Sequence, residues 1–141
     1  MANGTFEREF SLRPPKIGGT MKINEIAFTV YPVTDLKRAR HFYEEVLHLK
    51  PSHVFGDETT AWVEYDVGTG TIAIGNGVPE WKPNVGGGCA GLEVEDFDVA
   101  LKTLAEHKIA HRPAMDTPVC RMVILADPDG NSVILHKRKK V

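Results

Sequence analysis

The sequence lacks the features that mark several large classes of protein. It has only two cysteines, Cys89 and Cys120, which are far apart and form no Cys-x-x-Cys pair, so neither a disulfide framework nor a zinc knuckle is expected. No apolar run approaches the roughly 20 residues of a membrane span. The N-terminus carries no apolar signal-peptide segment. We therefore expect no membrane association and a reducing, cytoplasmic location.

An excess of charge of one sign is also missing. The formal net charge is −2, which gives no electrostatic reason to expect a nucleic-acid partner. The only basic run, Lys137-Arg138-Lys139-Lys140, is interpreted as a solvated C-terminus. The sequence contains neither a Gly-x-Ser-x-Gly nucleophile motif nor a phosphate-binding loop ending in Lys-Ser/Thr. These absences exclude the commonest hydrolase and nucleotide-binding signatures.

What the sequence does contain is an internal repeat. Shifted by 61 positions, the chain matches itself without a gap across a strand pattern, a helix pattern and a hairpin pattern. The identical pairs at this offset are Val33/Val94, Asp35/Asp96, Ala39/Ala100, Glu45/Glu106 and Asp66/Asp127. We interpret the body of the protein as two copies of one module. Two such modules facing each other would enclose a cleft lined by equivalent positions.

Each copy shows the same order of predicted elements. In the first, a β-rich segment (23–31) precedes a helix that Asp35 caps, and strands follow at 61–66 and 71–75. In the second, a strand (89–94) precedes a helix capped by Asp96, and strands follow at 122–126 and 132–136. A further strand after each helix completes a βαβββ module. The fold class is therefore α+β, with two tandem βαβββ modules.

The boundaries follow from composition. Residues 1–20 contain Gly and Pro without a sustained period and are expected to form a flexible N-terminal arm, with Met21 as a candidate true start. Residues 21–141 form one domain. Within it, module one covers 22–77, a linker rich in Gly and Pro covers 78–88, and module two covers 89–138.

Alternation along the strands assigns their faces. The steadily apolar positions are predicted to face the helices: Val63, Tyr65, Ile72, Ile74, Ala90, Leu92, Val94, Met122, Ile124, Val133 and Leu135. The opposite set mixes small, aromatic and charged side chains: Phe28, Trp62, Glu64, Ala73, Gly75, Cys89, Gly91, Glu93, Arg121, Val123, Leu125, Ser132, Ile134 and His136. This mixture favours a pocket with an apolar floor and a few polar groups. The alternative is a face buried between modules or subunits.

Two segments resemble a known family. The stretch from Val33 to Ala39 (VTDLKRA), followed by Phe42 to Leu47 (FYEEVL), resembles the first helix of the vicinal oxygen chelate superfamily. Asp127 to Asn131 (DPDGN) resembles its penultimate turn. That superfamily includes glyoxalase I, bleomycin-resistance proteins, extradiol dioxygenases and fosfomycin-resistance enzymes. The resemblance covers about 22–138. It implies two βαβββ modules forming a curved, barrel-like mixed sheet around a cleft, often in a homodimer.

The resemblance also identifies where the family's enzymes hold a divalent metal. They use His or Glu at one position on the first and last strands of each module, which here are Phe28, Cys89, Ala73 and Ile134. Only Cys89 among these has a metal-binding group, and a lone thiol is more often a small buried hydrophobe. We therefore expect no metal and no cofactor, and the usual lyase or dioxygenase chemistry is disfavoured. A shifted metal site of Cys89, His136 and a carboxylate is the alternative.

Other side chains on the predicted pocket face suggest different chemistry. His136 and Glu93 together could provide acid–base catalysis, or His136 could simply lie at the mouth of the cleft. Arg121 could clamp a carboxylate or phosphate of a ligand, or pair with Glu64 or Glu93. Trp81, in the linker, is either a lid over the cleft or a dimer contact.

Three functions remain open at this point. The first is a metal-free, homodimeric binding protein for a small apolar or aromatic molecule, similar to the bleomycin-resistance branch. Its predicted ligand-binding residues are Phe28, Trp62, Glu64, Ala73, Cys89, Glu93, Arg121, Val123, Leu125, Ile134 and His136. The second is an enzyme of the vicinal oxygen chelate type that uses non-standard groups such as His136 and Glu93. The third is an interaction module with no small ligand.

Overall fold

The computed structural model describes residue 22 and residues 26–140. The predicted arm (1–20), the candidate start Met21 and residues 23–25 of the first β-rich segment lie outside the described residues. The boundary at residue 20 therefore stays a prediction.

Module one begins with β1 (Thr29–Pro32), after which α2 (Leu36–Arg40) continues into η1 (His41–Val46), a π-helical segment. The predicted cap is confirmed, because the Asp35 carboxylate accepts a hydrogen bond from the backbone N–H of Arg38 at 3.0 Å. Three strands follow: β2 (Pro51–Gly56), β3 (Ala61–Val67) and β4 (Gly70–Gly75). They form a four-stranded sheet in the order β1-β4-β3-β2, in which only the β1–β4 pair is parallel. We call it sheet A.

Module two repeats this arrangement. β5 (Ala90–Glu93) leads into α3 (Phe97–Glu106), whose cap Asp96 accepts from the N–H groups of Asp98 and Val99. β6 (Met115–Asp116), β7 (Cys120–Ala126) and β8 (Ser132–Arg138) follow. The second sheet has the order β5-β8-β7-β6, again with one parallel pair, and we call it sheet B. The predicted fold class, α+β with two βαβββ modules, is confirmed, although the sheets do not close into one barrel.

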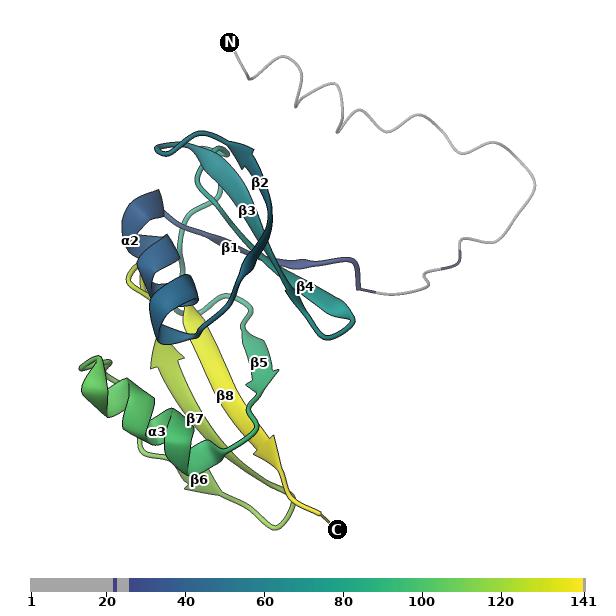
Figure 1. Cartoon of the computed structure of the whole chain (residues 1–141), viewed down its shortest axis with the longest axis vertical. Helices are drawn as coiled ribbons and strands as arrows, with labels where there is room; N and C mark the ends of the chain where they lie inside the picture. The colour runs from purple at the N-terminus through teal and green to yellow at the C-terminus, as the bar shows by residue number, and fades with distance from the viewer. Residues whose placement is uncertain (1–21, 23–25, 141) are drawn as a thin grey trace.

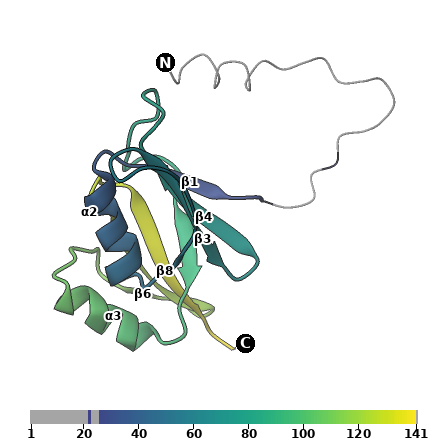
Figure 2. The same ribbon diagram turned by 45° about the horizontal axis from the view of Figure 1, so that its top comes forward.

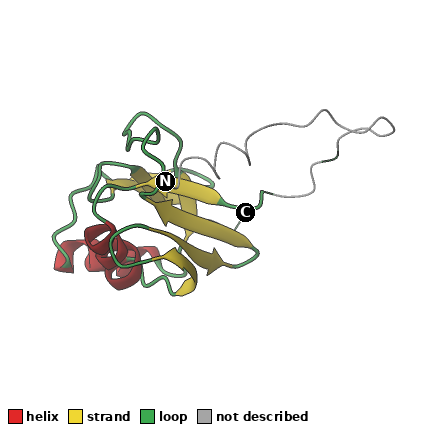
Figure 3. Cartoon of the chain, turned by 90° about the horizontal axis from the view of Figure 1, so that it is seen from above, coloured by secondary structure: helices red, strands yellow, loops and turns green. Residues whose placement is uncertain are grey.

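The helices lie on one side of the molecule and the two sheets on the other (Figures 1 and 2). The view from above shows the same two layers, with helices on one side of the strands (Figure 3). The core lies between these layers. It contains Val63, Tyr65, Ile72 and Ile74 of sheet A, as predicted, and Phe42, Tyr43, Val46, Phe97 and Leu104 of the helices. Burying such side chains stabilises the fold by about 1.5–3 kcal/mol each.

Hydrogen bonds between far-separated residues join the two modules. The turn between β7 and β8 packs against module one, where the buried Asp127 carboxylate accepts from the Tyr43 hydroxyl at 3.0 Å. The Asn131 side chain donates to the backbone carbonyl of Pro32 at 2.8 Å. From module one, the Tyr31 hydroxyl donates to the backbone carbonyl of Ser132 at 2.8 Å. The turn that resembles the family motif therefore fixes one module to the other.

One prediction about module two is wrong. Val123 and Leu125 of β7 lie in the core, with exposed fractions of 0% and 3%, whereas Met122 and Ile124 face the opposite side. The cause is the turn: Asp66 pairs with Thr71, but Ala126 pairs with Ser132, so the second hairpin turn holds one more residue. Because side chains alternate along a strand, a shift of one residue reverses both faces. The repeat is thus not free of gaps.

Among the described helices, none is long and apolar enough to cross a membrane.

Candidate functional site

Aromatic side chains gather on the face of sheet A that is turned away from the helices. We call this the open face of sheet A and define it by Phe28, Val30, His53, Phe55, Trp62, Glu64, Ala73 and Gly75, which share one side by strand register or ring contact. The Phe28 ring meets Trp62 edge-on, with centroids 5.2 Å apart and planes at 88°. Phe28 and Phe55 are 46% and 59% exposed. Such aromatic surface can stack against a planar ligand.

Trp62 is positioned by the residue opposite it. Register places Gly75 directly across from Trp62. A Cβ atom at Gly75 would lie 3.3 Å from the indole ring, so glycine lets this ring lie close over the backbone of β4. Trp62 is only partly buried, unlike its strand neighbours Val63 and Tyr65, which are 0% exposed. Trp62 is therefore a surface aromatic held in one orientation.

A single carboxylate lies among these rings. The indole N–H of Trp62 donates to Glu64 Oε1 at 2.9 Å, and His53 Nδ1 lies 3.6 Å from Glu64 Oε2. The His53 ring in turn stacks on Phe55, with centroids 6.0 Å apart and planes at 8°. The Glu64 side chain is 24% exposed. Glu64 can therefore accept a hydrogen bond from a donor on a ligand that stacks on the open face.

The linker brings a second tryptophan to this surface. The Trp81 ring centroid lies 6.3 Å from that of Trp62, with the planes at 54°, and Trp81 is 36% exposed. Of the two readings of Trp81 from the sequence, a lid over the cleft fits this contact. The reading as a dimer contact stays a prediction.

The corresponding face of sheet B, which we call the open face of sheet B, carries the predicted acid–base pair of His136 and Glu93. His136 Nδ1 lies 2.6 Å from Glu93 Oε2, and Glu93 Oε1 accepts from the backbone N–H of Arg138 at 2.6 Å. The Arg138 amide and the His136 side chain hold the pKa of the Glu93 carboxyl below its usual value. Ile134, Met122 and Ile124 share this face by register.

Three predicted pocket residues lie elsewhere. Val123 and Leu125 belong to the core, and Arg121 is on the helix side of β7. The guanidinium of Arg121 donates to Asp98 at 3.1 Å and lies 4.4 Å from the centroid of the Phe97 ring. Arg121 therefore fixes α3 to sheet B rather than pairing with Glu64 or Glu93. The face prediction for all three is wrong, because the extra turn residue reverses β7.

The family's four metal positions do not fit a metal ion. Phe28, Ala73 and Ile134 have no donor atom, and Cys89 is an exposed free thiol. Cys89 borders a hollow of about 340 Å³ between β4 and β5. Within residue 22 and residues 26–140, no three His, Cys, Asp or Glu side chains are arranged to hold a metal. These four side chains therefore give no chemical basis for a metal-dependent reaction at the family's metal position.

Some residues of the open faces were not predicted. His53 and Phe55 lie on β2, the strand that no alternation pattern located, since all six of its residues are exposed. Met122 and Ile124 were assigned to the wrong side. A comparison of the two hairpin turns would have revealed the extra residue and corrected β7.

A family model decides the identity of the fold. The model described as "Glyoxalase/Bleomycin resistance protein/Dioxygenase superfamily" matches residues 22–135. The chain belongs to this superfamily. Among curated proteins, none matches the chain.

Solved structures of superfamily members share the fold. An antibiotic binding protein, TnmS3, from Streptomyces sp. CB03234 is 23% identical, with a TM-score of 0.71, over 85% of this chain and 100% of its own. A glyoxalase/bleomycin resistance protein from the same strain is 24% identical, with a TM-score of 0.66, over 80% and 100%. Lactoylglutathione lyase from Agrobacterium tumefaciens is 20% identical, with a TM-score of 0.65, over 82% and 95%. At these identities the likeness shows the superfamily fold and not the ligand.

Proposed function

We propose that this superfamily member binds a small aromatic molecule on the open face of sheet A, without metal and without chemical conversion. The observation that carries the proposal is a partly exposed aromatic cluster in which Phe28 and Trp81 contact Trp62, whose indole N–H donates to the Glu64 carboxylate. Monomeric proteins seldom expose aromatic side chains in a contiguous group unless the group serves recognition. The antibiotic-binding description of TnmS3 supports a binding role, although its identity to this chain is only 23%.

The polar group of this site restricts the ligand. Glu64 is an acceptor when ionised, and the rings around it have electron-rich faces. A planar ligand with an amine or another N–H donor at its edge satisfies both features. We therefore expect the site to prefer aromatic ligands that carry such a donor over aromatic acids of the same size, because a ligand carboxylate would face Glu64.

The proposal includes a second copy of the chain. Apolar side chains on β2 are exposed, with Val54 at 46% and Phe55 at 59%. A homodimer would cover this surface and close the open face into the cleft expected from the sequence. Light scattering coupled to size exclusion tests the dimer, and a monomer at micromolar concentration contradicts it.

Tryptophan fluorescence tests the ligand directly. The only tryptophans of the chain are Trp62 and Trp81, and both lie at the site. A library of aromatic amines, neutral aromatics and aromatic acids is titrated against the protein in the presence of EDTA. The proposal expects saturable quenching by the amines, reduced by Glu64→Gln. Absence of quenching by every class contradicts it.

An enzyme is the second candidate, supported by the 2.6 Å contact between His136 and Glu93. Glu93 can fix one imidazole nitrogen so that the other exchanges a proton with a substrate. Under this candidate His136→Ala abolishes turnover of a bound ligand without abolishing binding. Under the binding-protein proposal, the bound ligand is recovered unchanged from the native protein.

A further inference from the structure

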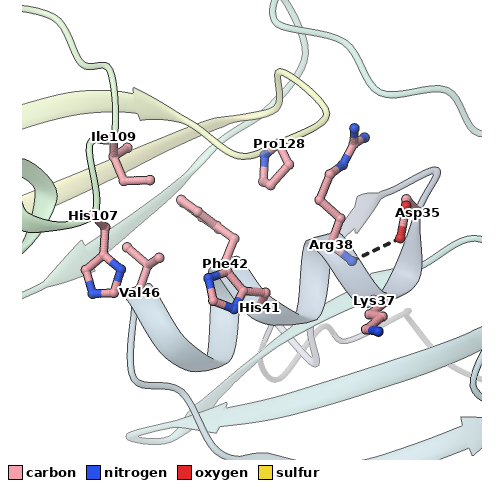
Figure 4. A pocket seen from close by; sticks show the side chains of 9 residues that line it. All are labelled: Asp35, Lys37, Arg38, His41, Phe42, Val46, His107, Ile109 and Pro128. Atoms are coloured by element: carbon pink, nitrogen blue, oxygen red, sulfur yellow. Dashed lines mark hydrogen bonds between the residues drawn. The ribbon is translucent and has the colours of Figure 1, made fainter.

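A separate hollow lies on the helical side of the molecule, away from both open faces. Its volume is about 460 Å³, within the range typical of small-ligand sites. Figure 4 shows it from close by. Its walls come from both modules: α2 and η1, the residues after α3, and the turn between β7 and β8. The lining residues are Asp35, Lys37, Arg38, His41, Phe42, Val46, His107, Ile109 and Pro128.

The floor of this interhelical hollow is apolar. Phe42 and Val46 are 2% and 4% exposed and belong to the core, and Ile109 packs against that core. Pro128 faces Phe42 across the hollow in Figure 4. Ile109 is partly buried and Pro128 is exposed, so an apolar ligand body placed here would remove their surface from water, which favours binding.

The rim is rich in hydrogen-bond donors. In Figure 4 the imidazoles of His41 and His107 lie on either side of Val46. Both residues are exposed, and neither side chain forms a hydrogen bond within the described part of the chain. Lys37 has no ion-pair partner among the described residues. His41, His107 and Lys37 thus place hydrogen-bond donors around the apolar floor, and these side chains pair with no described residue.

The two carboxylates near the rim are partly engaged, because Asp35 and Asp129 each accept through Oδ1, while Asp129 Oδ2 is buried without a described partner. Asp35 is the only carboxylate that lines the hollow, and its Oδ1 accepts from the Arg38 backbone. Asp129, whose side chain is 2% exposed, accepts from one terminal nitrogen of Arg38 at 3.2 Å. That contact partly neutralises the Arg38 charge, but a guanidinium has five N–H donors and keeps others free. The rim therefore suits a ligand that brings acceptor oxygens.

We propose that the interhelical hollow binds a small organic anion with an apolar body and a single carboxylate or sulfonate. The apolar body lies on Ile109 and Pro128 above Phe42 and Val46, the anionic group accepts from the imidazoles of His41 or His107, and Arg38 adds positive charge to the same rim. The site lies opposite the open face of sheet A and does not depend on the proposed function.

The test uses the full chain and two fluorescent probes that differ in charge. 1-Anilinonaphthalene-8-sulfonate carries the anionic group, and N-phenyl-1-naphthylamine has the same rings without it. The variant His41→Glu/His107→Glu places negative charge on the rim at two exposed positions, so that folding is expected to persist. His53→Glu makes the same change on the open face of sheet A and is the matched control.

The proposal expects saturable sulfonate binding at one site per chain. Binding should weaken by roughly tenfold in the double variant, since hydrogen bonds to a charged group are replaced by repulsion. It should be unchanged in His53→Glu and Trp62→Ala, whose melting temperatures are measured alongside. If the double variant weakens the uncharged probe as much as the sulfonate, or if sulfonate binding is lost in Trp62→Ala but not in the double variant, the proposal is overturned. A failure of this kind leaves the aromatic site on sheet A untouched.

Discussion

The register of β7 decides whether Arg121 faces the predicted pocket or the helices. On the pocket side it would have recognised an acidic ligand, but it bridges Asp98 and the Phe97 ring on the helix side. Its contacts join α3 to sheet B. Arg121 is therefore a structural residue of module two.

We predict that Arg121→Ala lowers stability without changing affinity for any ligand of the open faces. The ion pair with Asp98 is partly exposed and contributes up to about 1 kcal/mol, and the contact with Phe97 adds about 0.5–1 kcal/mol. Chemical denaturation measures the change. Arg121→Lys, which keeps the charge but loses the planar group, should recover part of it. A selective loss of affinity for acidic ligands would contradict this prediction and show that Arg121 contacts the ligand.

Glu93 gives a prediction about acid. Its pKa is lowered in the folded protein by the Arg138 amide and His136, so the contact stabilises the fold above the pKa of an unfolded glutamate. That contribution is lost as the pH falls through the lowered pKa. Glu93→Gln should therefore flatten the acid limb of a plot of melting temperature against pH. An unchanged acid limb would show that the contact contributes nothing.

At the scale of elements, the turn between β7 and β8 holds the modules together. Asp127 is 5% exposed, and its carboxylate accepts from the Tyr43 hydroxyl, the Asn131 amide groups and the Asp129 backbone. Burial, together with this carboxylate, raises the pKa of Tyr43 well above its usual range. The tyrosine therefore stays a donor at every physiological pH.

We predict that Tyr43→Phe destabilises the protein by about 1–3 kcal/mol, because Asp127 loses a buried donor. The ring remains, so no cavity forms. Asp127→Asn in the Tyr43→Phe background should cost less than it does alone, since the two groups interact. Equilibrium unfolding of the four proteins measures this coupling, and additive costs would contradict it.

The elements themselves were largely predictable from the sequence, and their register was not. Asp35 and Asp96 cap helices as the pattern indicated. The faces of β3 and β4 followed from alternation because a tight turn, with Val67 opposite Gly70, joins them. In β7 the identity of Asp66 with Asp127 suggested a continuous offset, although one lies in a strand and the other in a turn. Alternation gives two faces but cannot say which is buried when both are apolar, as in β7.

The candidate site was predictable in part for the same reason. Trp62, Glu64 and Phe28 were found because period-2 alternation places them on the face opposite the steadily apolar positions, and the resemblance places Phe28 at a metal position of the family. His53, Phe55 and the placement of Trp81 against Trp62 depend on an exposed edge strand and a linker. Neither has a hydrophobic period that would reveal its position.

At the scale of the whole molecule, the superfamily fold is kept while its metal-binding positions are replaced. We predict that protein purified without chelators holds no stoichiometric divalent metal, because Phe28, Ala73 and Ile134 cannot ligate one. Elemental analysis checks this. About one Ni, Zn, Fe or Mn ion per chain, lost in Cys89→Ser or His136→Ala, would contradict it and favour a shifted site.

The central claim is that the open face of sheet A is a binding surface and the opposite face is core. Isothermal titration in EDTA, with the first ligand found by tryptophan quenching, tests it in Trp62→Ala and Tyr65→Ala, each with its measured stability. Trp62→Ala should lose most of the affinity while losing less stability than the roughly 3–5 kcal/mol typical of a buried aromatic truncation, and Tyr65→Ala should lose stability of that size. If Trp62→Ala unfolds the protein, or binds the ligand as tightly as the unaltered chain, the claim is wrong.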